Sequence, residues 1–196
     1  LLQRGDPRDA LVASDGRRLA DIPDGSRIGT SSRRRAALLG AIRPGLKIVE
    51  IRGNVDTRLR RLETGEYDGV LLAAAGLDRL GRLGEATQIF DAMEFLPAPG
   101  QGGLVLQCRS DDHDLQEQLA EVDDSPSRVA AEAERAFLSA LGAGCTLPIG
   151  AYAQLSDGFL VLRGMISDDE SSYFGRQDRS PAFGDAAGAP DEAADL

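Results

Sequence analysis

The residues best suited to chemistry in this sequence are arginines gathered between positions 27 and 61. That segment holds ten basic and two acidic residues, within a chain of 196 residues whose formal net charge is −10. Nine of the ten are arginine, whose planar guanidinium group binds carboxylate or phosphate through two parallel hydrogen bonds. The segment therefore predicts an anion-binding site, and a solvated basic helix face is the alternative interpretation.

The first arginines stand where a chain binds anions readily. Residues 26–30 read as a short strand that ends in a turn, and Ser31 and Ser32 offer hydroxyl groups to cap a helix over 33–42. Positions 33–35, all arginine, then occupy the first helical turn, where the positive end of the helix dipole disfavours cations. The free N–H groups of that turn bind anions, so an anionic ligand would offset the cost.

A second strand-to-helix turn repeats the arrangement. Residues 46–51 form an apolar run typical of a strand, and 52–54 form a turn. Asn54 is suited to cap a helix that carries Arg58, Arg60 and Arg61. Because both turns follow strands, they are expected to direct arginines toward one anion site.

The rest of the chain narrows the class of ligand. Residues 62–196 carry eight basic and 25 acidic residues, so most of the surface would repel a nucleic-acid backbone. No apolar run approaches the roughly 20 residues of a membrane span. With two cysteines, no secretory signal and no metal-ligand spacing, we expect a cytoplasmic protein with reduced thiols and no metal. A compact small-molecule polyanion is the expected partner, rather than nucleic acid or a membrane.

Strands alternating with helices over residues 1–96 predict an α/β domain with a mixed, mostly parallel sheet and flanking helices. The domain should end in the proline- and glycine-rich stretch 97–103, which is followed by a predicted strand at 104–107.

A smaller α+β domain is expected after this boundary. An acidic helix is predicted at 111–122, and a long helix at 125–141 with Ser125 as its N-cap. The predicted buried stripe of the long helix is Val129, Ala133, Ala136, Phe137, Ala140 and Leu141. Apolar runs predict a three-stranded antiparallel sheet at 149–154, 159–165 and 171–176. Residues 184–196 have the composition of a disordered tail.

Few residues are suited to act as a nucleophile. His113, the single histidine, lies among aspartates at a polar helix start and gives little support to Ser-His-Asp or Cys-His catalysis. Cys108 ends an apolar run and is expected to be a packed thiol. Cys145 lies in the glycine-containing loop 142–150, which exposes a thiol and allows close approach of another molecule. A glycine helix C-cap followed by an incidental cysteine is the alternative for this loop.

Seven motifs resemble, in the same order, those of the porphobilinogen deaminase family, also called hydroxymethylbilane synthase. They are Asp6-Pro7-Arg8-Asp9-Ala10, Ile28-Gly29-Thr30-Ser31-Ser32-Arg33-Arg34-Arg35, Arg52-Gly53-Asn54-Val55-Asp56-Thr57-Arg58, Gly65-Glu66-Tyr67-Asp68, Ala75-Gly76-Leu77-Asp78-Arg79-Leu80-Gly81, Pro99-Gly100-Gln101-Gly102 and Gly144-Cys145-Thr146-Leu147-Pro148-Ile149-Gly150. The resemblance implies a periplasmic-binding-protein-like middle domain at 1–96 and a hinge and return segment of the family's first domain at 97–120. A C-terminal domain that carries the cofactor cysteine is implied at 121–183.

The resemblance also implies a reaction and a cofactor. Members of the family are transferases of haem biosynthesis that join four porphobilinogen units head to tail, with loss of ammonia. The chain grows on a dipyrromethane cofactor that a thioether attaches to the loop cysteine, here Cys145. Each pyrrole carries an acetate and a propionate, so the product is a polycarboxylate. The other residues implied to bind it are Thr30, Ser31, Ser32, Arg34, Arg35, Arg52, Arg58 and Arg79.

The resemblance leaves out the family's catalytic aspartate, which belongs to a Lys-Asp motif upstream of Leu1 and is matched by neither Asp6 nor Asp9. It therefore implies a chain that is inactive alone, missing the start of the first domain and the end of the third, and a full-length enzyme that is monomeric. Arg33 stands where the family commonly has leucine and adds charge. The alternatives are a non-catalytic polycarboxylate- or phosphate-binding module and a redox-active thiol at Cys145.

Overall fold

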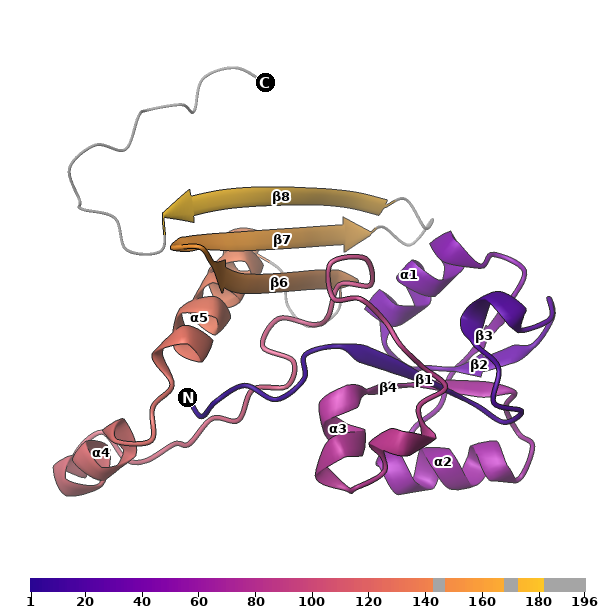
Figure 1. The fold of residues 1–196 in the computed structure, drawn as a ribbon, viewed down its shortest axis with the longest axis horizontal. Coiled ribbons are helices and arrows are strands. Elements are labelled where there is room, and N and C mark those ends of the chain that lie inside the picture. Colours follow the sequence, from indigo (N-terminus) through magenta and orange to yellow (C-terminus); the bar gives the residue numbers. More distant parts are fainter. Residues whose placement is uncertain (143–146, 168–172, 182–196) are drawn as a thin grey trace, which may run out of the picture.

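The computed structural model describes residues 1–142, 147–167 and 173–181, the last of these as a backbone strand (Figure 1). Two regions singled out in the sequence, Cys145 and the tail 184–196, lie outside the described residues.

A five-stranded mixed sheet forms the first part of the molecule. The strands are β1 (Asp9–Ala13), β2 (Arg27–Gly29), β3 (Lys47–Val49), β4 (Gly69–Ala73) and β5 (Gln88–Ile89), and their order is β3-β2-β4-β1-β5. Strand β2 pairs in parallel with β3 and β4, whereas β1 pairs antiparallel with β4 and β5. Four of these strands therefore run in one direction and β1 runs against them, so the mixed sheet expected from the sequence is present.

Helices cover both faces of this sheet. Helix α1 (Arg33–Ile42) lies on one face, and α2 (Val55–Glu63) and α3 (Ala74–Arg79) lie on the other (Figure 1). Along β1, Leu11 packs into the core on the α1 side, while Ala10 and Val12 pack into the core on the α2 side. This alternation follows from the two-residue period of a strand, and it explains why β1 is buried along its whole length.

The second part is a small α+β unit. It contains α4 (His113–Ala120), α5 (Ser125–Ala140) and an antiparallel sheet in the order β6-β7-β8, with strands Ile149–Ser156, Phe159–Ser167 and Tyr173–Pro181. Helix α5 packs against β6 and β7. Met165 of β7 joins the core on the α1 side of the first sheet, so the two parts share a buried contact.

Three details of the second part differ from the predictions. Residues 104–107 form no strand, and the N-cap of α5 is Asp124 rather than Ser125. The predicted buried stripe of α5 is wrong in part, because Ala136, Ala140 and Leu141 are exposed. The buried residues of α5 are Ser127, Ala130, Ala131 and Glu134. The predicted stripe is wrong in part because α5 buries the charged side chain of Glu134.

Candidate functional site

The predicted ligand residues gather at one edge of the first sheet. Strands β2, β3 and β4 run parallel, so their carboxyl ends meet at the same edge, and each end leads into a turn or helix that carries predicted residues. In open α/β sheets, ligands bind at this edge. Strand β1 runs the other way and therefore begins there, with Asp9 paired to Ala73 at the end of β4.

Asp9 is completely buried and lies between two guanidinium groups. Arg34 donates through Nη1 to Oδ2 of Asp9 at 2.7 Å, and Arg35 donates through Nε to Oδ1 at 2.9 Å. The Nη2 atom of Arg35 forms an ion pair with Oδ1 at 2.7 Å. Arg34 also donates to the carbonyl oxygen of Leu96, and Arg35 to that of Leu71 at 3.1 Å. One carboxylate thus forms ion pairs with two buried cations, and the three groups together keep one net positive charge.

The charge state of this cluster follows from opposing effects. Burial raises the pKa of Asp9, but the neighbouring charges of Arg34 and Arg35 outweigh it and hold that pKa below its ordinary value. Burial lowers the pKa of Arg34, and Asp9 opposes the change. A guanidinium group nevertheless stays charged at physiological pH, so the cluster remains ionised. The Nε group of Arg34 is buried and has no hydrogen-bond partner among the described residues.

Gln101 completes the cluster, although it was not among the predicted ligand residues. Its amide donates to the carbonyl oxygen of Pro7 at 2.7 Å and to Oδ1 of Asp9 at 3.0 Å, and it accepts from Arg34 at 3.3 Å. The loop after residue 96 is thereby fixed to the edge of the sheet.

The three hydroxyl residues hold the turn between β2 and α1. Ser32 caps α1 by accepting from the backbone N–H of Arg35, as the sequence predicted. Thr30 is buried and accepts from the backbone N–H of Ser32, while the hydroxyl of Ser31 donates to the carbonyl oxygen of Ile51 in the neighbouring turn. Each hydroxyl therefore has a structural contact that shapes the edge.

The remaining predicted arginines are more exposed than Arg34 and Arg35. Arg52 is exposed and pairs with Glu50, and Arg79 is exposed and donates to the carbonyl oxygen of Gly102 at 2.9 Å. Arg58 is partly buried and donates through Nε to the carbonyl oxygen of Gly53 at 2.9 Å. Burial, and then the nearby charge of Arg35, lowers the pKa of Arg58. No carboxylate pairs with Arg58 in the described part of the chain, so its charge is available to a ligand.

A second buried ion pair, absent from the sequence-based predictions, connects the two parts of the molecule. Arg4 donates through Nη1 and Nη2 to the two oxygens of Glu134 at 2.7 and 3.0 Å, and Glu134 is completely buried in α5. The backbone N–H groups of Gly100 and Ala153 also donate to this carboxylate. Arg4 donates further to the carbonyl oxygen of Gln101, so both buried ion clusters contact the same loop. The residues three and four positions from Glu134 along α5 are all apolar (Ala130, Ala131, Phe137 and Leu138), and this is the sequence signal that could have identified it.

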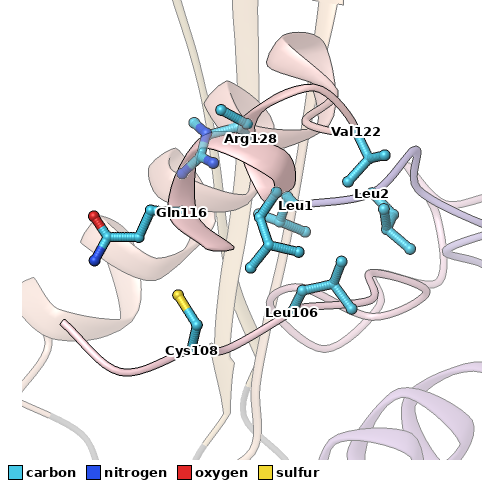
Figure 2. Close-up of a pocket in the computed structure, with 9 residues that line it drawn as sticks. Leu1, Leu2, Leu106, Cys108, Gln116, Val122 and Arg128 are labelled. Carbon is cyan, nitrogen blue, oxygen red and sulfur yellow. The ribbon is translucent and has the colours of Figure 1, made fainter. Parts of the chain in front are cut away.

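Cys108 does not lie at the described edge. Cys145 lies outside the described residues. Cys108 lines a different pocket of about 240 Å³, formed by the N-terminus, the extended segment that follows residue 103, α4 and α5 (Figure 2). The pocket is lined by Leu1, Leu2, Leu106, Cys108, Gln116, Leu119, Ala120, Val122 and Arg128. This mostly aliphatic lining does not suit a polycarboxylate.

Two features are absent from the described residues. No helix there is long and apolar enough to cross a membrane, and no group of three or more His, Cys, Asp or Glu side chains is placed to hold a metal ion.

Comparison with known proteins assigns the family. Residues 1–117 match the family model described as porphobilinogen deaminase, dipyromethane cofactor binding domain, and residues 129–195 match that of the porphobilinogen deaminase C-terminal domain. The chain belongs to the porphobilinogen deaminase family. All eight predicted ligand residues other than Cys145 lie within the cofactor-binding match, and Cys145 lies within the C-terminal match.

Individual porphobilinogen deaminases are similar over most of this chain. The protein from Roseiflexus sp. (strain RS-1) is 52% identical over 164 residues, which are 84% of this chain and 54% of the relative. The one from Syntrophobacter fumaroxidans is 45% identical over 182 residues, which are 92% of this chain and 59% of the relative. That of Corynebacterium diphtheriae is 46% identical over 178 residues, or 91% and 60%. The chain thus spans somewhat more than half the length of these relatives.

Proposed function

We propose that the protein acts as a hydroxymethylbilane synthase. This transferase condenses four porphobilinogen units head to tail, with release of ammonia, in tetrapyrrole biosynthesis. The observation that carries the proposal is the gathering of arginines from three strand-to-helix turns at one sheet edge, within the region that matches the cofactor-binding domain.

The residues at this edge fit a dipyrromethane cofactor attached to Cys145. Such a group supplies the primer to which new pyrrole units are added, and its acetate and propionate side chains are carboxylates. The described edge offers what carboxylates bind: the excess positive charge of a buried cluster, beside arginine side chains that are exposed or partly exposed. Arg58 adds a partly buried charge that no described carboxylate neutralises.

Different residues of this edge would have different roles in binding. Arg52, Arg58 and Arg79 are the arginines with exposed or partly exposed side chains, and we assign them direct contact with ligand carboxylates. Arg34 and Arg35 would supply a fixed positive field from below the surface. Thr30, Ser31 and Ser32 would keep the turn in the shape that presents the N-terminal N–H groups of α1 to an anion.

We also propose the domain assignment implied by the resemblance. Residues 1–96 form the family's periplasmic-binding-protein-like middle domain, 97–120 a hinge and return segment of its first domain, and 121–183 the domain that carries Cys145. The exposure of Val105, which is 73%, and of Leu104 and Leu106 supports a return segment that packs against further protein. A monomeric, cytoplasmic full-length enzyme belongs to the same proposal.

Intact-mass spectrometry tests the proposed function. The 196-residue chain is produced in cells supplied with porphobilinogen, together with Cys145→Ala and the matched control Cys108→Ala. We expect a mass increase of two pyrrole units in the unaltered chain and in Cys108→Ala, and none in Cys145→Ala. An unmodified thiol in all three would contradict the proposal and favour a non-catalytic anion-binding module, and oxidised Cys145 without a pyrrole adduct would favour a redox thiol.

A further inference from the structure

We propose that Asp9 is a positioning residue for carboxylate binding: it fixes the guanidinium groups of Arg34 and Arg35 in one arrangement and cancels only one of their two charges. This inference rests on the proposed function, because it assigns the retained positive charge to an acidic ligand. It starts from the reversed direction of β1, which brings the first residue of that strand to the carboxyl ends of β2 and β4.

Each oxygen of Asp9 has a separate task. Oδ2 accepts from Arg34 at 2.7 Å, and Oδ1 accepts from Arg35 at 2.9 Å and from the amide of Gln101 at 3.0 Å. The side chain has no exposed surface, so water cannot replace any of these contacts. A long arginine side chain has many rotamers in solution, and ordering two of them beside one another requires an acceptor placed between them.

The arrangement has a consequence for the exposed part of the edge. Two buried guanidinium groups without a carboxylate would repel each other strongly at low dielectric. Arg35 already acts electrostatically on Arg58, the partly buried arginine that we assign to ligand binding. Movement of Arg35 away from its place would therefore change the field and the geometry that Arg58 offers to a carboxylate.

The Asp9→Asn variant shows whether the Asp9 carboxylate positions the two guanidinium groups or only fills space in the core. The amide has the same shape, but one of its two oxygens becomes an NH₂ group. In either orientation, this NH₂ group would face N–H donors of Arg34 or Arg35, so one guanidinium must lose its contact. The matched control is Asp24→Asn, because Asp24 also pairs with an arginine, Arg43 at 3.1 Å, but is exposed and belongs to a different turn.

The experiment combines a spectroscopic signal with a binding measurement. NMR spectra of the ¹⁵N-labelled 196-residue chain record the arginine Nε–H groups that exchange slowly with water. Binding of porphobilinogen, as a small dicarboxylate probe, is measured by calorimetry at a temperature where circular dichroism shows each variant folded. We expect Asp9→Asn to lose the protected Nε–H signal of whichever arginine, Arg34 or Arg35, faces the new NH₂ group. We also expect it to bind the probe at least about tenfold more weakly, while Asp24→Asn changes neither.

A double variant covers the case in which Asp9→Asn does not fold. Asp9→Asn combined with Arg34→Gln restores the net charge of the cluster to +1, and the amide oxygen at position 9 can turn toward Arg35. We expect this variant to fold and to show the protected Arg35 signal. It should bind the probe more weakly than the unaltered chain because one guanidinium is gone.

The outcomes distinguish the inference from the proposed function. No binding by the unaltered chain would contradict the proposed function, and the NMR signals would then decide on Asp9 alone. Unchanged Arg34 and Arg35 signals, together with unchanged probe affinity, in folded Asp9→Asn would overturn the inference. Failure of both variants to fold would also overturn it, since Asp9 would then be a residue of the core only.

Discussion

Buried guanidinium groups in this protein are matched to carboxylates that lie far away in the sequence. Arg34 and Arg35 reach back 25 and 26 residues to Asp9, and Arg4 reaches forward 130 residues to Glu134. The arginine-rich turns could be predicted from residue type and spacing. Their partners could not, because a single aspartate at the start of an apolar strand is indistinguishable from a turn residue until the direction of the strand is known.

Removing the Glu134 charge should strongly destabilise the protein. Glu134→Gln places an NH₂ group against Arg4 or a backbone N–H and leaves Arg4 without its counter-ion, so we expect the free energy of unfolding to fall by about 3–5 kcal/mol. Glu132→Gln is the matched control on the same helix, because Glu132 is exposed and its ion pair with Arg128 spans 3.7 Å. The control should cost less than about 1 kcal/mol in urea denaturation. Equal losses would show that the buried pair contributes no more than a surface pair.

The lowered pKa of Asp9 predicts a loss of stability in acid. A carboxyl group whose pKa is lower in the folded state stabilises the fold above its unfolded pKa of about 4, and this contribution disappears as the pH falls through the folded value. We expect the free energy of unfolding to fall as the pH drops below about 5, and to fall less in Asp9→Asn. Parallel pH profiles for the two proteins would show that the fold does not lower the pKa of Asp9.

Among the helices and strands, predictions that depend on neighbouring residues are confirmed, whereas predictions that depend on residues distant in the sequence are wrong. The helix at Arg33–Ile42, its Ser32 cap and the Asn54 cap of α2 are confirmed, because these depend on neighbouring residues. The strand predicted at 104–107 is wrong, since an apolar run pairs as a strand only where a partner strand is available. The buried face of α5 was misplaced because apolar periodicity cannot anticipate that Glu134 turns inward to meet Arg4.

The packing of α5 on the second sheet depends on one glycine. A Cβ atom at Gly164 of β7 would lie 2.4 Å from the ring of Phe137 in α5. Gly164→Ala should therefore cost about 1–3 kcal/mol, because the ring has to move out of a packed position. Combining it with Phe137→Leu should recover part of that loss, so the double variant should be more stable than the sum of the single effects. Strictly additive denaturation energies would rule out the contact as the cause.

For the whole molecule, the segregation of charge is the feature that joins sequence to function. The chain is net negative, yet ten basic residues fall between positions 27 and 61. Folding brings four of them, Arg34, Arg35, Arg52 and Arg58, to the edge where three parallel strands end, and Asp9 neutralises part of their charge. The proposed function therefore predicts that an acidic ligand is attracted to one edge of a protein whose remaining sequence is largely acidic, and that this attraction is specific to the site and sensitive to salt.

The central claim, that this edge binds pyrrole carboxylates, is tested most directly by calorimetric titration of the chain with porphobilinogen. The comparison is Arg58→Gln against Arg61→Gln, since Arg61 lies on the same helix but already pairs with Glu66 at 2.8 Å. We predict binding by the unaltered chain that weakens about tenfold in Arg58→Gln and stays unchanged in Arg61→Gln. Equal affinity in all three proteins, or equal weakening in both variants, would contradict the account.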